Sequence, residues 1–289
     1  NGELRKALTG RSFASQDALD HAMIELDGTS NKSNLGANAV LAVSLAFARA
    51  CAADRGVPLY EQFGRIAGGP APIRYLPRPT INLFSGGLHA GGQVPLQDVL
   101  VVPSAPTSID KVLSVTYAVY QAASDLVDEK YGMRRLTADE GGLAPPFGSA
   151  GEMLEDAVEA IERAGFVPGE EVALALDVAS SHFYDDGEYR LEDAAVSPQV
   201  MIDTIEDWIE RYPITSVEDG LAEEDWSHWP ELCSRIARHA LVLGDDLLCT
   251  NPDRIERAIE TDAANALLLK VNQIGTLTEA ARAYELARS

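Results

Sequence analysis

The sequence predicts an α/β fold in which parallel β-strands alternate with α-helices. Four short apolar runs recur between residues 173 and 270, and each run ends in a charged residue. These charged residues are Asp177, Glu218, Asp245 and Lys270. The amphipathic, helix-like segments between the runs cover residues 198–211, 224–239 and 253–260. Continuous apolar runs alternating with such helices are typical of parallel strands that crossover helices cover on both faces.

The four charged residues indicate a binding site. Ligands gather at the carboxyl ends of parallel strands, so we expect these side chains to meet at one mouth. Asp177, Glu218 and Asp245 offer the oxygen ligands that Mg²⁺ prefers. Lys270 follows three leucines, which predicts a poorly solvated amine with the lowered pKa that a general base requires. The alternatives are a strand-end cap or a buried ion pair for each carboxylate, and a salt bridge for the lysine.

Length, charge and cysteine content narrow the class of protein. A chain of 289 residues can form one large domain, or a medium domain and a small one. The net charge of −22 argues against a nucleic-acid or anionic-membrane partner, since both require basic patches. We find no signal peptide and no apolar run long enough to cross a bilayer. Cys51, Cys233 and Cys249 show no paired spacing, as expected for reduced thiols in a cytoplasmic protein.

The N-terminal part of the chain predicts helices. Residues 16–26 and 36–55 have helical apolar spacing, and the second segment is rich in alanine. The Gly- and Pro-rich residues 68–72 resemble a linker. We therefore expect domains at residues 1–67 and 73–289.

Two glycine-bearing loops follow this linker. The strands and helices expected around them cover residues 80–84, 98–102, 108–130 and 150–164. Four glycines around His89 make a mobile loop that can approach a ligand with its backbone. Glu140 lies beside another acid and two glycines, a pattern more typical of a site than of a random acidic pair. A satisfied polar histidine and a solvated acidic loop are the alternatives.

A resemblance to the enolase family runs through almost the whole chain. The matching stretches, in family order, are residues 27–39, 87–91, 139–142, 176–181, 216–219, 244–247 and 268–275. The run from Lys270 to Gly275, Lys-Val-Asn-Gln-Ile-Gly, is highly specific. The chain therefore looks like a divergent member of this family.

The resemblance implies an enolase-type modified α/β barrel with antiparallel first strands, preceded by part of an N-terminal α+β capping domain. It places a mobile serine-containing loop before residue 1 and the last barrel strands after residue 289. We therefore expect the chain to be part of a longer protein, with an incomplete barrel that exposes a strand edge. A cytoplasmic homodimer or higher homo-oligomer is also implied.

The reaction implied is the reversible dehydration of 2-phosphoglycerate to phosphoenolpyruvate in glycolysis, with Mg²⁺. By matching position, Lys270 would remove the proton alpha to the substrate carboxylate, and Glu140 would help hydroxide leave as water. The metal ligands implied are Asp177, Glu218 and Asp245. The residues implied to contact the phosphorylated carboxylic acid are His89, Gln97, Asp98, Glu218, Asp245 and Lys270.

Four positions depart from the family pattern. Asp98 and His182 stand where the family has Glu, Leu88 where it has Ser, and Gly220 where it has Pro. They motivate a second hypothesis, an enolase-like paralog acting on another phosphorylated or phosphonate three-carbon acid, of the carboxyphosphonoenolpyruvate synthase type. A third hypothesis is a non-catalytic binding protein on the same fold, against which the intact set of charged residues argues.

Overall fold

The computed structural model describes residues 2–69, 76–104, 108–133, 135–192 and 194–289. The chain forms two compact units, neither continuous in sequence. Of the described residues, the first unit holds 2–69, 248–260 and 267–289, and the second holds the rest. The expected linker at residues 68–72 lies partly outside the described residues. The division into domains at residues 1–67 and 73–289 stays a prediction.

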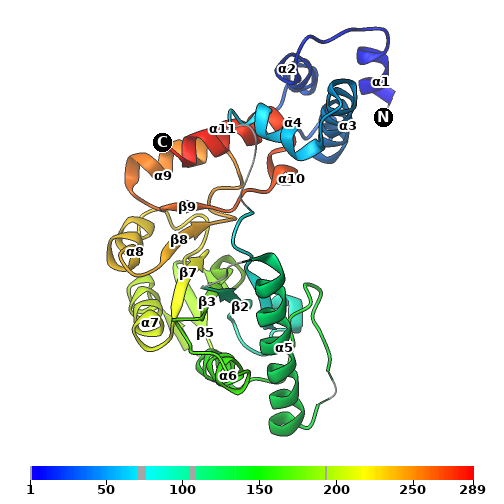
Figure 1. Ribbon diagram of the computed structural model, residues 1–289. Helices are drawn as coiled ribbons and strands as arrows, with labels where there is room; N and C mark the ends of the chain where they lie inside the picture. The colour runs from blue at the N-terminus through cyan, green and yellow to red at the C-terminus, as the bar shows by residue number, and fades with distance from the viewer. Residues whose placement is uncertain (1, 70–75, 105–107, 134, 193) are drawn as a thin grey trace. The chain divides into compact units, whose positions relative to one another are not determined.

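Helices dominate the first unit (Figure 1). They are α1 (Gly2–Leu8), α2 (Gln16–Asp27), α3 (Ala37–Arg55), α4 (Leu59–Ile66), α9 (Pro252–Thr261), α10 (Val271–Ile274) and α11 (Leu277–Ala287). The two N-terminal helices that the sequence predicts are confirmed as α2 and α3. Ser15 caps α2 by accepting the N–H of Ala18, and Gly28, at a φ of 70°, ends it. The apolar core between these helices is built on Leu4, Leu19, Met23 and Val40.

Among the described residues, α3 is the one helix that is long and apolar enough to cross a membrane by length and composition. Its mean hydropathy reaches 1.3, which corrects the expectation of no such run. The helix reaches this value because it is rich in alanine, which raises its mean hydropathy. Its buried residues are Val40, Leu41, Ser44, Ala48 and Ala52. These residues form the one face of α3 that packs inside the unit, and 28% of the apolar stretch is buried there.

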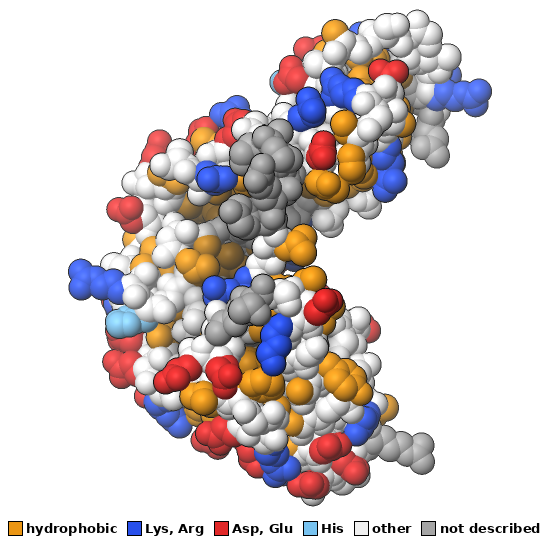
Figure 2. Space-filling view, viewed as in Figure 1, with side chains coloured by type: hydrophobic (Ala, Val, Ile, Leu, Met, Phe, Trp, Pro, Cys, Tyr) orange, Lys and Arg blue, Asp and Glu red, His pale blue; other side chains and the backbone are white. Residues whose placement is uncertain are grey.

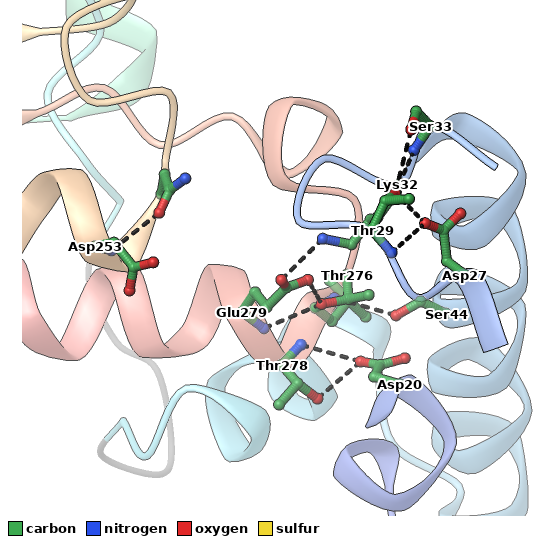
Figure 3. A network of polar contacts seen from close by, with 12 residues as sticks. Asp20, Asp27, Thr29, Lys32, Ser33, Ser44, Asp253, Thr276, Thr278 and Glu279 are labelled. Carbon is green, nitrogen blue, oxygen red and sulfur yellow. Dashed lines mark hydrogen bonds and ion pairs between the residues drawn. The ribbon is translucent and has the colours of Figure 1, made fainter. Parts of the chain in front are cut away.

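Buried polar contacts join α11 to α2 and to the loop before α3 (Figure 3). Asp20 accepts the N–H of Thr278 at 3.0 Å and its hydroxyl at 2.8 Å. Lys32 donates to Glu279 at 2.8 Å, and only 3% of the Lys32 side chain is exposed. These contacts connect residues more than 240 positions apart in the chain. They fix the C-terminal helix on the N-terminal helices of the same unit.

Substitution of Lys32 is expected to destabilise the protein strongly. Lys32→Met should lower the free energy of unfolding by about 3 kcal/mol, because the partly buried Glu279 carboxylate loses its cationic partner. Urea unfolding measures the loss. The control is Arg163→Met, which removes an ion pair with the exposed Glu129 and should cost less than about 1 kcal/mol. Equal losses in the two variants would contradict this account of the buried pair.

The second unit is built on an open mixed sheet with the strand order β1-β2-β3-β7-β8-β9. The strands are β1 (Ile81–Ser85), β2 (Asp98–Pro103), β3 (Val172–Asp177), β7 (Ile214–Glu218), β8 (Leu241–Gly244) and β9 (Ala266–Leu267), which ends at the unit boundary. β1, β2 and β3 pair antiparallel, whereas β3, β7 and β8 pair parallel. The antiparallel start and the parallel continuation are both confirmed. Within the described chain β1 and β9 do not pair, so the barrel is not closed.

Four helices of the second unit are α5 (Ile109–Tyr131), α6 (Ala150–Arg163), α7 (Pro198–Arg211) and α8 (Trp229–Ile236). α7 has the predicted bounds, because Ser197 caps its first turn and Pro198 occupies its first position. The prediction of a helix over residues 224–239 is wrong at both ends. α8 begins only at Trp229, next to Pro230, and the preceding turn is held by a 2.6 Å contact between Asp225 and His228.

A small separate sheet and three tryptophans complete the second unit. The sheet contains β4 (Tyr184–Asp185), β5 (Glu188–Leu191) and β6 (Ala194–Val196), all antiparallel. Trp208, Trp226 and Trp229 are all buried in this unit. On the face of this unit seen in Figure 2, acidic and basic side chains are interspersed.

Candidate active site

The register of the central strands brings acidic residues to one edge of the sheet. Asp98 on β2 lies opposite Asp177 on β3, and Asp177 lies opposite Glu218 on β7. Glu218 lies opposite Leu243 on β8, and Asp245 directly follows that strand. Since β3, β7 and β8 are parallel, the three carboxylates that follow the apolar runs all lie at carboxyl ends of strands, where ligands bind.

Asp219, which the sequence analysis assigned no role, fixes the loop after β8. Its carboxylate accepts the N–H of Asp245 at 3.0 Å and the N–H of Asp246 at 2.8 Å. Asp219 is only 4% exposed, and this burial raises the pKa of its carboxyl group to about 7, although the two N–H groups oppose the change. One oxygen from each of the three aspartates lies within 4.8 Å of the others. The sequence signal for this role of Asp219 was its position directly after Glu218, the last residue of β7.

Gln97 and Asp98 form a polar wall at the start of β2. Gln97 donates from Nε2 to Asp177 Oδ2 at 2.9 Å, which orients that carboxylate, and Gln97 Oε1 is buried with no hydrogen-bond partner among the described residues. Asp98 is 1% exposed and accepts the hydroxyl of Ser85 at 2.5 Å. Burial raises the pKa of Asp98 to about 6, the Ser85 hydrogen bond opposes this, and the charge of Glu140 adds to it.

His89 and Glu140 come together from the two glycine-bearing loops. His89 Nδ1 and Glu140 Oε1 are 3.8 Å apart. With an oxygen of Asp98 they form a group whose members lie within 4.8 Å of one another. Asn82 on β1 donates to Glu140 at 3.0 Å, so a strand residue holds the exposed carboxylate. The structure thus brings the expected general acid, Glu140, together with two side chains that the resemblance assigns to substrate contact, His89 and Asp98.

Glycines make the close packing of these loops possible. A Cβ at Gly142 would clash with Ser85 Oγ and stand 3.1 Å from the backbone of Phe84. A Cβ at Gly86 would clash with the carbonyl oxygen of Leu96. The loops can therefore lie against β1 and the start of β2 only because these positions carry no side chain.

Lys270 belongs to the first unit, where it is the residue before α10. Its backbone N–H donates to Thr250 Oγ1 at 2.8 Å. Lys270 is exposed, so the expectation that it is poorly solvated is wrong. The reason is that β9 contains only Ala266–Leu267, and the leucines after it lie outside the strand, with Leu269 exposed as well.

The other departures from the family pattern occupy different surroundings. Leu88 is 67% exposed at the tip of the glycine-rich loop, and His182 is exposed in a short 3₁₀ turn after β3. Gly220 is buried, and a Cβ there would stand 3.0 Å from Leu232 and 3.1 Å from Ile205. The change at Gly220 therefore concerns packing against α7 and α8.

The chemistry of the strand-end residues fits a hard divalent cation. Asp177, Glu218 and Asp245 offer carboxylate oxygens from neighbouring strand ends, and Mg²⁺ and related ions prefer such ligands. Asp219 and Asp246 add further acidic oxygens beside Asp245. These residues could hold a metal ion.

Comparison with known proteins identifies the family. Residues 1–63 match the description "Enolase, N-terminal domain", and residues 73–289 match "Enolase, C-terminal TIM barrel domain". The chain belongs to the enolase family. It is 47% identical over 283 residues to a curated protein named "Enolase" from Methanopyrus kandleri, a match that covers 97% of this chain and 65% of the relative. The chain therefore spans about two thirds of the length of this relative.

Membership in the enolase family confirms the resemblance and the fold class that the sequence predicted. The family implies a divalent metal, and groups of acidic residues lie at the strand ends of the described chain. The roles of the individual residues remain predictions. Of the residues that the sequence analysis missed, Asp219, Ser85 and Asn82 each hold an assigned carboxylate or its backbone.

Proposed function

We propose that this enolase-family protein catalyses the reversible dehydration of 2-phosphoglycerate to phosphoenolpyruvate, a lyase reaction of glycolysis. The observation that carries the proposal is the parallel register that brings Asp177, Glu218 and Asp245 to neighbouring strand ends. The 47% identity to a protein named "Enolase" supports the same chemistry. We further propose Mg²⁺ as the metal, since the donor set consists of carboxylates.

In this proposal the strand-end carboxylates hold the metal. Asp177, Glu218 and Asp245 would bind it; Gln97 orients the Asp177 carboxylate, and Asp219 fixes the Asp245 backbone. A bound ion would supply positive charge beside the substrate carboxylate, and this charge would stabilise the negative charge that develops when the alpha proton leaves. Contacts that hold two of the three ligands from a second residue favour one coordination geometry.

Lys270 and Glu140 move the protons. The Lys270 amine takes the proton from the carbon alpha to the carboxylate, and the electron pair of that bond forms the new carbon–carbon double bond. The hydroxyl on the adjacent carbon then leaves as water with a proton from Glu140. The fixed position of Glu140, held by Asn82 at 3.0 Å, suits a general acid.

His89, Gln97 and Asp98 contact the substrate in this proposal. His89 lies 3.8 Å from Glu140, so it can reach the same leaving group or the adjacent phosphate. Asp98, with its pKa raised to about 6 by burial, can share a proton near neutral pH. We also propose a cytoplasmic homodimer, which the family resemblance implies.

Turnover of two substrates tests the proposal. The full-length protein with Mg²⁺ should convert 2-phosphoglycerate to phosphoenolpyruvate, followed by absorbance. Its kcat/KM for a phosphonate analogue of the substrate should be lower on the order of a hundredfold, as expected for a site built around the phosphate ester. The opposite preference would move the assignment to the paralog type. Binding of Mg²⁺ and substrate with no turnover of either compound would support the non-catalytic alternative.

A further inference from the structure

Thr250 has an unusual backbone conformation in the turn before α9. It is fully buried, and its φ is 54°, next to a φ of 47° at Cys249. Branched side chains rarely adopt this left-handed region. Conformations of this kind persist where the surrounding structure enforces them, and they cluster at functional sites. The contacts of the Thr250 side chain therefore need an explanation.

The Thr250 hydroxyl contacts three groups of the segment that carries Lys270. It accepts the Lys270 N–H at 2.8 Å. It lies 3.3 Å from the Leu268 carbonyl oxygen and 3.3 Å from Gln273 Oε1, and it can donate its single proton to either. One hydroxyl thus links the end of β9, the backbone of Lys270 and the first turn of α10.

The other end of this segment is held by α3. Gly275, which ends α10 at a φ of 92°, lies so close to the start of α3 that a Cβ on it would stand 2.9 Å from Lys32 and 3.3 Å from Ala37. Leu277 donates its N–H to the buried Ser44 hydroxyl at 3.1 Å. Thus α3 holds the C-terminal end of the segment that carries Lys270. The Thr250 hydroxyl holds the N-terminal end of the same segment, at the backbone of Lys270.

We propose that Thr250 is a positioning residue for Lys270, whose hydroxyl fixes the backbone from which the lysine side chain extends. The inference rests on the proposed role of Lys270 as the base. A general base must come within hydrogen-bond reach of the proton that it removes, and a displacement of about 1 Å can cost on the order of a hundredfold in rate. A flexible four-carbon side chain reaches one place reliably only if its backbone root is fixed.

A purely structural role would give the same contacts, since buried N–H groups need acceptors in any protein. The two roles differ in what removal of the hydroxyl changes. A structural hydroxyl contributes to stability alone. A positioning hydroxyl contributes to kcat as well, and its conservative replacement should restore the rate.

Three variants of the full-length protein separate these roles. Thr250→Val keeps the branched shape and removes the hydroxyl, whereas Thr250→Ser keeps the hydroxyl. The control is Thr276→Val, because Thr276 is equally buried and its hydroxyl contacts Glu279, accepting its N–H at 3.2 Å and donating to its carboxylate at 2.5 Å. Each variant is assayed with 2-phosphoglycerate and Mg²⁺, and its thermal midpoint is measured.

We expect Thr250→Val to lower kcat on the order of thirtyfold, with KM within about twofold of wild type. Thr250→Ser should stay within about threefold of the wild-type kcat. Thr276→Val should lower the thermal midpoint as Thr250→Val does, and leave kcat within about twofold. Equal kcat losses in the two valine variants, or no recovery with serine, would overturn the proposal.

Amide hydrogen exchange provides a readout that does not depend on turnover. The Lys270 amide should exchange on the order of tenfold faster in Thr250→Val than in wild type, and at the wild-type rate in Thr276→Val. Unchanged exchange in Thr250→Val would overturn the positioning role even in an inactive protein. A wild type without turnover would instead overturn the proposed function and the catalytic part of this inference with it. An active wild type whose kcat is unchanged in Thr250→Val would overturn this inference alone.

Discussion

Glu218→Gln is expected to raise the Mg²⁺ concentration for half-maximal turnover on the order of a hundredfold. Glu218 lies opposite Asp177 in the register of β3 and β7, at the centre of the three strand-end carboxylates. Glutamine keeps the size of the side chain but removes its negative charge. Hard cations such as Mg²⁺ prefer charged carboxylate oxygens as ligands. Loss of residues that merely orient a ligand already costs ten- to hundredfold in metal affinity in roughly similar sites.

A titration of activity with Mg²⁺ measures this effect. The matched control is Glu188→Gln, which makes the same chemical change at an exposed position on the small sheet. The control should need the wild-type Mg²⁺ concentration. A Glu218→Gln protein with an unchanged Mg²⁺ requirement would remove Glu218 from the metal site, whatever its kcat.

Lys270→Ala is expected to lower kcat for 2-phosphoglycerate about a thousandfold or more. A positioned base contributes on the order of a hundred- to ten-thousandfold, and alanine leaves no group that can accept the alpha proton. The proposed metal ligands Asp177, Glu218 and Asp245 are unchanged in this variant. The Mg²⁺ requirement should therefore stay near the wild-type value, in contrast to Glu218→Gln.

Steady-state kinetics measures this loss, with Lys6→Ala as the control. The control distinguishes removal of the base from removal of one positive charge. Lys6 is exposed on α1, in the same unit as Lys270. Its removal should change kcat by less than about twofold, as expected for a surface position. A Lys270→Ala protein with more than about a tenth of the wild-type kcat would show that another group takes the proton.

The fold followed from the sequence wherever local signals and tertiary packing agree. The helix at Pro198–Arg211 was predicted at both ends, because a serine cap and a proline mark its start. The segment at residues 224–239 was read from apolar spacing alone. Pro230 near the true start of α8 was the missed signal, and the contacts of Asp225 with Tyr189 and His228 keep the preceding turn out of the helix.

The small sheet also carried a signal that spacing alone did not reveal. Tyr184 and Tyr189 flank Asp186 and Gly187, which have φ values of 49° and 86°. An Asp-Gly pair between two strands is a strong hairpin signature, because both positions of a tight hairpin turn require positive φ. The strands on either side of this turn are short, so the alternation of apolar and polar residues that marks a strand was weak.

The candidate site was predictable in its residue types and only partly in its environment. The charge at the end of each apolar run placed Asp177, Glu218 and Asp245 correctly at strand ends. The exposure of Lys270 was not predictable, since three preceding leucines suggest a buried strand that the structure ends after Leu267. The roles of Asp219 and Thr250 depend on contacts that only the folded chain creates.

Exchange of the substrate's alpha proton with solvent shows whether Lys270 removes that proton with the help of a divalent metal. The full-length protein is incubated with 2-phosphoglycerate and Mg²⁺ in deuterated water, and deuterium at the alpha carbon is followed by NMR or mass spectrometry. We predict that the wild type incorporates deuterium, and that Lys270→Ala and metal-free protein do not. Exchange that persists undiminished in Lys270→Ala, or that needs no divalent metal, would contradict the account of a lysine base acting on a metal-bound acid.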